Sequence, residues 1–170
     1  TLLSVCGLQC CAHVFQWDWA GLLARADRLF ELSSSSGDKL HQCLSLGFRA
    51  WAQGHLGQGS DARNLRARMG RMAHALGGAL MLDEWFDAAD AELALLDQRY
   101  EEALDRGRGV SKRARASGSL LAQGIGERVW GHAVWQLGGT ATECDRHFRH
   151  SLDALERGGL FPQAARTRLE

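Results

Sequence analysis

Apolar side chains recur along the chain every three or four residues, which is the spacing of one face of an α-helix. Because the chain has only one proline and few β-branched residues, the pattern predicts an all-α protein without strands. The expected helices run from 2 to 16, from a corner at 17–19 to 37, from 38 to 57, from 60 to 77, from near 80 to 97, from 100 to 116, from 119 to 138, from 140 to 158, and from about 162 onward.

Several helix starts carry residues that favour capping. Asp38 is a good N-cap, and Ser60 or Asp61 can cap the helix that follows. Thr140 and Glu143 have the spacing of a capping box, in which each side chain accepts a hydrogen bond from the backbone N–H of the other residue. These residues predict where helices begin.

Four glycines, Gly37, Gly77, Gly118 and Gly159, recur at intervals of about 40 residues, each at the expected end of a second helix. Glycine can adopt the positive φ that terminates a helix, which gives the repeat a backbone cause. The interval predicts four antiparallel helix hairpins at about 1–37, 38–77, 78–118 and 119–159, with a partial repeat at 160–170. All 170 residues would then form one repeat domain, and the chain reads as a piece of a larger protein.

Other glycines lie inside the helical pattern, where each costs about 1 kcal/mol relative to alanine. Close contact between helices is the expected compensation. These interior glycines are Gly47, Gly54, Gly70, Gly107, Gly124, Gly126 and Gly131.

The charge balance excludes one class of function. Lys plus Arg and Asp plus Glu number 20 each, so the chain lacks the positive field that draws a protein to nucleic acid or to an anionic membrane. No apolar run approaches the length needed to span a bilayer. The five cysteines are odd in number and have no disulfide spacing, and no signal peptide is visible, so we expect a cytoplasmic protein with reduced thiols.

Two segments resemble a known repeat family. Residues 99–104 read RYEEAL and 114–118 read ARASG, and this pair is similar to the second helix of a tetratricopeptide repeat. Residues 143–148, 152–159 and 164–169 (ECDRHF, LDALERGG and AARTRL) resemble the long-period repeats found C-terminal to the ATPase module in large bacterial LuxR-family transcriptional regulators and related cyclase or kinase proteins. The standard tetratricopeptide period is about 34 residues, so the helices here would be longer, and HEAT-type repeats share the longer period.

The resemblance implies a right-handed α-solenoid that binds a regulatory ligand or a protein partner and passes that state to attached effector domains. We therefore expect a non-catalytic segment with a protein or peptide partner or a small-molecule effector. A protein–protein assembly module that forms homo-oligomers is the alternative. An all-α enzyme with an unrecognised site is a third hypothesis, although no phosphate loop, nucleophile elbow, CxxC pair or HExxH motif occurs.

The tetratricopeptide register also suggests binding residues, because the first helix of each hairpin lines the concave face in that family. Large rigid side chains there would supply contact area at low entropic cost. The alternative is that these aromatic side chains pack in the core between helices. The candidates are His41, Phe48, Trp51, Trp85, Glu92, Gln123 and Trp130.

Two sets of residues have partial metal-ligand spacing. Cys6, Cys10 and His13 lie on one helical face, whereas Cys144, His147 and His150 spread around theirs. Neither set is closed, so we expect no metal and no cofactor. Acidic side chains between 83 and 92 lie between arginine-rich neighbouring helices, and we expect them to form cross-helix ion pairs or to be solvated; an acidic groove for a basic partner is the alternative.

Overall fold

The computed structural model describes residues 1–78 and 80–169, and these residues are all helix and turn, without a strand. Ala79 and Glu170, which fall in the third and last predicted repeats, lie outside the described residues. The chain divides into two compact units, Thr1–Met81 and Leu82–Glu170. The single array predicted over 1–170 stays a prediction. None of the described helices combines the length and the apolar character needed to cross a bilayer.

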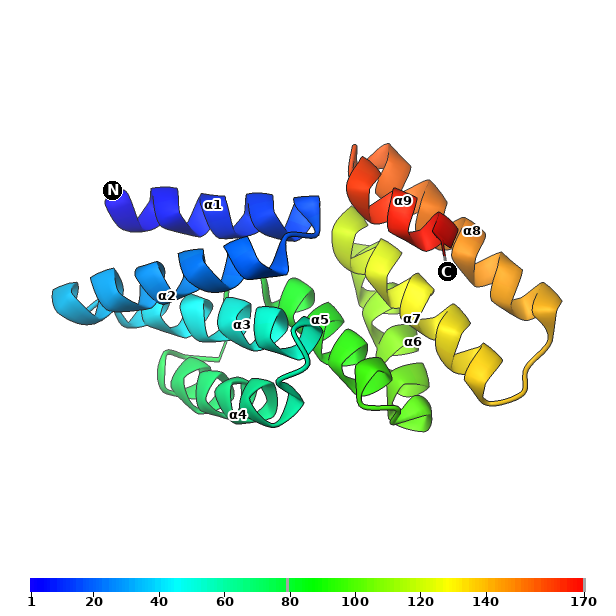
Figure 1. Cartoon of the computed structure of the whole chain (residues 1–170), viewed down its shortest axis with the longest axis horizontal. Helices are drawn as coiled ribbons and strands as arrows, with labels where there is room; N and C mark the ends of the chain where they lie inside the picture. Colours follow the sequence, from blue (N-terminus) through cyan, green and yellow to red (C-terminus); the bar gives the residue numbers. More distant parts are fainter. Residues whose placement is uncertain (79, 170) are drawn as a thin grey trace. The chain divides into compact units, whose positions relative to one another are not determined.

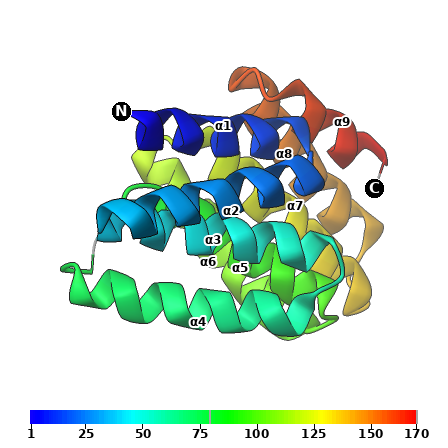
Figure 2. The same ribbon diagram turned by 60° about the vertical axis from the view of Figure 1, so that its left-hand side comes forward.

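The first unit contains four helices in two hairpins: α1 (Leu2–Gln16), α2 (Trp19–Ser36), α3 (Lys39–His55) and α4 (Gly59–Ala75). Turns of two or three residues join each helix to the next, which leaves only an antiparallel path. Figures 1 and 2 show α2 packed between α1 and α3, and α4 packed against α3. Leu22 and Leu29 of α2 and Leu46 of α3 are fully buried, and each contributes about 2 kcal/mol through removal of its side chain from water.

The second unit contains five helices: α5 (Asp83–Leu96), α6 (Tyr100–Ser117), α7 (Leu120–Gln136), α8 (Ala141–Arg157) and α9 (Phe161–Leu169). Each helix packs against the next, and α5 also packs against α7. In the first unit α1 contacts α3 in the same way. Within each unit, therefore, the first helices of successive hairpins touch each other as well as their own partners.

The four periodic glycines all lie at the ends of second helices, as predicted. Gly37 and Gly118 are the C-caps of α2 and α6, whereas Gly77 and Gly159 lie one residue beyond the C-caps of α4 and α8. Their φ angles are 73°, 104°, 82° and 68°, in the left-handed region where a side chain costs free energy. The glycine period therefore has the backbone cause inferred from the sequence.

The caps predicted at Asp38 and Thr140 agree with the structure, whereas the predicted starts of two other helices differ from it. The Asp38 carboxylate accepts from the backbone N–H of His41, and the capping box at Thr140 is complete. The prediction that Ser60 or Asp61 caps α4 was wrong, because the helix begins at Gly59 and both residues lie in its first turn. There the Asp61 carboxylate interacts favourably with the helix dipole.

The start of α5 was also predicted wrongly. The helix begins at Asp83 rather than near Leu80. The reason is the backbone of Leu82, whose φ of 73° is incompatible with a right-handed helix. Asp83 and Glu84 then occupy the first turn, where their charges favour the exposed N–H groups of the helix end.

Interior glycines allow α6 and α7 to approach closely. A Cβ built on Gly107 would lie 2.9 Å from the carbonyl oxygen of Gly126 and 3.0 Å from the backbone nitrogen of Trp130. A Cβ on Gly126 would lie 2.9 Å from the nitrogen of Ser111. The expected compensation for these two glycines is thus confirmed, but a Cβ on Gly70 would meet nothing within 4 Å. Close packing explains Gly107 and Gly126 and not Gly70.

Two acidic side chains of α5 form the expected ion pairs with α6. Asp87 lies 2.7 Å from Arg113, and Asp90 lies 3.9 Å from Arg106. Because these pairs are partly exposed, each contributes only a few tenths of a kcal/mol to stability.

Asp38→Ala is expected to lower the free energy of unfolding by about 1 kcal/mol at neutral pH, because the cap of α3 is lost. The backbone N–H of His41 holds the pKa of the Asp38 carboxyl below its usual range. Because the pKa of Asp38 is lower in the folded protein, the ionised carboxylate stabilises the fold at any pH above the pKa of the unfolded chain. This contribution disappears as the pH falls through the pKa of the folded protein. Urea unfolding of both proteins across this acid range should show the difference shrink, whereas Asp153→Ala, at an exposed position within α8, should change little at any pH.

Candidate functional site

The predicted concave residues of the first unit do not form an open groove. Phe48 and Trp51 are 1% and 0% exposed, and the Trp51 ring lies 5.8 Å from that of Trp19. We expected these two side chains to be exposed on the concave face. They are buried instead, because removal of a large aromatic ring from water stabilises the fold. His41 is half-buried, with its Nδ1 2.8 Å from an Asp38 oxygen. The core interpretation therefore applies to Phe48 and Trp51.

The predicted residues of the second unit fall in different environments. Trp85 and Gln123 are half-buried, whereas Glu92 is buried. Trp130 is half-buried and stacks on His147 of α8, with 4.0 Å between the ring centroids. The Arg108 guanidinium of α6 lies 5.3 Å from the centroid of the Trp130 ring. Trp130 thus faces the second helices α6 and α8. A binding role for these residues stays a prediction.

Glu92 belongs to a buried polar network centred on Arg128. The Arg128 guanidinium donates to the Glu92 carboxylate at 2.8 Å, to the Gln163 side-chain oxygen at 3.2 Å and to the Thr167 hydroxyl at 3.2 Å. The Arg128 and Glu92 side chains are only 2% and 5% exposed. The network joins α5, α7 and α9, and a buried charge pair of this kind needs its full set of hydrogen bonds to be tolerated.

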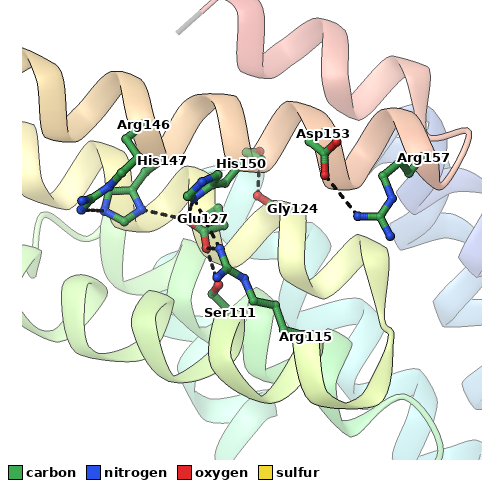
Figure 3. Close-up of polar contacts among 10 residues, drawn as sticks. Ser111, Arg115, Gly124, Glu127, Arg146, His147, His150, Asp153 and Arg157 are labelled. Atoms are coloured by element: carbon green, nitrogen blue, oxygen red, sulfur yellow. Dashed lines mark hydrogen bonds and ion pairs between the residues drawn. The ribbon is translucent and has the colours of Figure 1, made fainter.

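Glu127, which precedes Arg128 in the chain, contacts side chains of α6 and α8 and forms a second network (Figure 3), which we call the Glu127 cluster. Its carboxylate is fully buried. Oxygen Oε1 accepts hydrogen bonds from Ser111 at 2.5 Å and from Arg115 at 2.6 Å. Oxygen Oε2 lies 2.7 Å from Nδ1 of His147 and 3.7 Å from Nδ1 of His150. The Glu127 cluster therefore brings side chains of α6, α7 and α8 to one carboxylate.

The surroundings of Glu127 keep its carboxyl ionised. Burial raises the pKa of Glu127, but hydrogen bonds from His147 and Ser111 and the positive charge of Arg115 together lower it below its usual value. The Arg146 guanidinium lies 3.3 Å from Nε2 of His147 and can only donate. Nε2 therefore accepts, and Nδ1 of His147 carries the proton that it donates to Glu127.

A surface pocket of about 300 Å³ lies on the α7–α8 hairpin beside Trp135. Trp135 is 58% exposed, whereas the other five tryptophans are buried or half-buried. The His132 ring meets the Phe148 ring edge to face at 5.1 Å in the same pocket. An exposed aromatic side chain beside an apolar depression is typical of a contact surface for another molecule. The pocket is lined by His132, Trp135, Ala141, Cys144, Asp145 and Phe148.

Sequence reasoning missed Glu127, Arg128 and Trp135. A signal existed for the first two, since they are the only Asp, Glu, Lys or Arg residues in α7, and charged residues within an apolar helix are buried only when paired. For Trp135 the signal was its place outside the apolar stripe that contains Val134 and Leu137. The sequence could not identify the residues that Glu127 and Arg128 contact, because those residues lie on other helices.

The two cysteine-containing sets behave differently. Cys6 and Cys10 are buried in α1, whereas His13 bonds to Asp18 at 2.9 Å. Cys144 lines the Trp135 pocket, so it does not join its helix neighbours in the Glu127 cluster. Among residues 1–78 and 80–169, the one group with metal-ligand proximity is Glu127, His147 and His150.

The fold and these sites define the class of molecule as an all-α protein of antiparallel helix hairpins. Comparison with known proteins found no match to a family model, a curated protein or a solved structure. The function is therefore argued from the residues of this chain.

Proposed function

We propose that this chain is a non-catalytic repeat module that binds a protein or peptide partner within a larger cytoplasmic bacterial regulator. In this proposal its hairpins belong to a right-handed, tetratricopeptide-like solenoid. Supporting the repeat are the positive-φ glycines at the ends of α2, α4, α6 and α8. The contacts of α1 with α3 and of α5 with α7 also suit stacked hairpins, because each unit of a solenoid buries its apolar face against the next.

The observation that carries the binding role is the exposed Trp135 at the rim of the α7–α8 pocket. A tryptophan that is 58% exposed offers a large, rigid apolar surface to a partner. The pocket itself, about 300 Å³, accommodates one large apolar side chain. Its carboxylate, Asp145, pairs with exposed Arg149 at 2.8 Å, so a basic residue of the partner can replace that contact. We therefore expect a peptide with an apolar anchor next to a basic residue.

The test is a selection of displayed random peptides on the purified chain, followed by fluorescence anisotropy with the enriched sequences. Trp135→Ala should weaken binding about 30-fold, since removal of a central aromatic anchor costs about 2 kcal/mol. Phe161→Ala provides the matched control, because Phe161 is 65% exposed in the same unit but does not line the pocket. That variant should bind within about twofold of the parent.

Equal loss in the two variants would show that the pocket is not the binding surface. Enriched peptides without an apolar anchor would likewise contradict the proposal. Turnover of a substrate by the isolated chain would remove the non-catalytic assignment.

Self-association is the second candidate, and one observation favours it. Leu2, Val5 and Leu8 form an exposed apolar stripe along α1, with 61%, 51% and 70% of their surfaces accessible. A second copy of the chain could cover this stripe. Light scattering across a dilution series tests the alternative, because an assembly module should lose mass on dilution, whereas a monomeric binding module should not.

A further inference from the structure

The Glu127 cluster brings together three potential metal ligands, of which the sequence spacing connected only His147 and His150. Each of Glu127, His147 and His150 offers one ligand atom, and these three atoms all lie within 4.8 Å of one another. His147 and His150 are one turn apart on α8, and Figure 3 shows both turned toward the carboxylate of α7. From this geometry we propose that Glu127, His147 and His150 bind a divalent transition metal ion, with zinc as the preferred ion. This site is separate from the partner surface proposed at Trp135.

The two oxygens of Glu127 have different neighbours, which leaves one of them for a metal. Oε1 accepts from Ser111 and Arg115, at 2.5 Å and 2.6 Å. Oε2 instead faces the Nδ1 atoms of His147 and His150. Hydrogen bonds to the second oxygen of a ligating carboxylate orient it and are a common feature of metal sites. Ser111 and Arg115 are thus placed to hold the Glu127 carboxylate in position.

The donor set selects the type of ion. Two imidazole nitrogens and one carboxylate oxygen suit zinc, whereas calcium and magnesium prefer oxygen ligands alone. Three protein ligands leave a fourth tetrahedral position. The side chains of His150 and Arg115 are 47% and 49% exposed, so solvent reaches this side of the Glu127 cluster. A water molecule can therefore complete the coordination.

Binding requires small, identifiable movements. Ligand atoms around a tetrahedral zinc ion lie about 3.3 Å apart, given bonds of about 2.0 Å. The 2.7 Å separation of His147 from Glu127 must lengthen slightly, and the 3.7 Å separation of His150 must shorten. Nδ1 of His147 must give up the proton that it donates to Glu127, with Nε2 protonated in its place, so the exposed Arg146 must rotate away from Nε2. Arg115, 3.4 Å from His150, must also withdraw toward solvent.

The test is a titration of the reduced full chain with Zn²⁺ by calorimetry and with Co²⁺ by absorption spectroscopy. We expect one equivalent to bind, with the d–d bands of tetrahedral cobalt and no sulfur-to-cobalt charge-transfer band. His150→Ala should weaken binding at least about tenfold, because one of three ligands is lost. His150 is exposed, so this substitution should not prevent folding, which circular dichroism can verify.

His74→Ala is the control, since His74 is an exposed histidine of α4 that belongs to neither the Glu127 cluster nor the Trp135 pocket, and it should bind zinc like the parent. A parent chain that does not saturate at one equivalent would overturn the proposal. So would unchanged affinity in His150→Ala, or a sulfur charge-transfer band, which would place the ion at the cysteines. Loss of peptide binding in Trp135→Ala with unchanged zinc affinity would show that the two sites are independent.

Discussion

Replacement of Arg128 with alanine is expected to lower the free energy of unfolding by about 4 kcal/mol. Arg128 is buried, and its guanidinium lies 2.8 Å from the buried Glu92 carboxylate. Removal of the cation leaves the buried Glu92 carboxylate without this counter-charge and also deprives Gln163 and Thr167 of a donor. The loss therefore exceeds that expected from truncation of a surface arginine. Urea unfolding followed by circular dichroism measures the effect.

The double substitution Glu92→Leu with Arg128→Met is the informative control. It removes both charges and keeps the volume, so it should recover most of the stability lost in Arg128→Ala. Arg149→Ala, at an exposed arginine of α8, should change stability by less than about 1 kcal/mol. If Arg128→Ala were no more harmful than Arg149→Ala, the buried network would not contribute to the stability of the second unit.

Replacement of Gly107 with alanine is the second large effect, and we expect a loss of about 2 to 3 kcal/mol. The added Cβ would lie 2.9 Å from the Gly126 carbonyl oxygen and 3.0 Å from the Trp130 nitrogen. Both atoms belong to the backbone of α7, so no side chain can rotate to relieve the contact. Separation of α6 from α7 would also lengthen the hydrogen bond of Ser111 to Glu127. Thermal and urea unfolding should both register the loss.

Gly109→Ala is the matched control on the same helix. Its Cβ would lie 3.3 Å from the terminal nitrogen of the half-exposed Arg113 side chain, which can move. Alanine has the higher helix propensity, so this substitution should stabilise the protein by about 0.5 to 1 kcal/mol. Opposite signs for the two substitutions would establish that helix contact, rather than helix propensity, explains Gly107. Destabilisation by both would contradict that explanation.

The sequence determined the local structure of this protein, because local structure depends on neighbours in the chain. Apolar spacing predicted the helices, and Gly37, Gly77, Gly118 and Gly159 predicted where the second helices end. Asp38 and Thr140 predicted two caps for the same reason, since each bonds to a backbone group three residues away. The exceptions were α4, which begins at Gly59 without a side-chain cap, and α5, whose start depends on the unusual backbone of Leu82.

Only the tertiary structure decided which polar side chains meet. Arg128 pairs with Glu92 and with residues of α9, 35 to 39 positions away in the chain, and Glu127 meets His147 across 20 positions. It likewise decided that Phe48 and Trp51 are buried while Trp135 is exposed. Helical periodicity establishes which residues share a face, but the environment of that face depends on which helices pack against it. That choice follows from contacts distant in sequence, which no local pattern specifies.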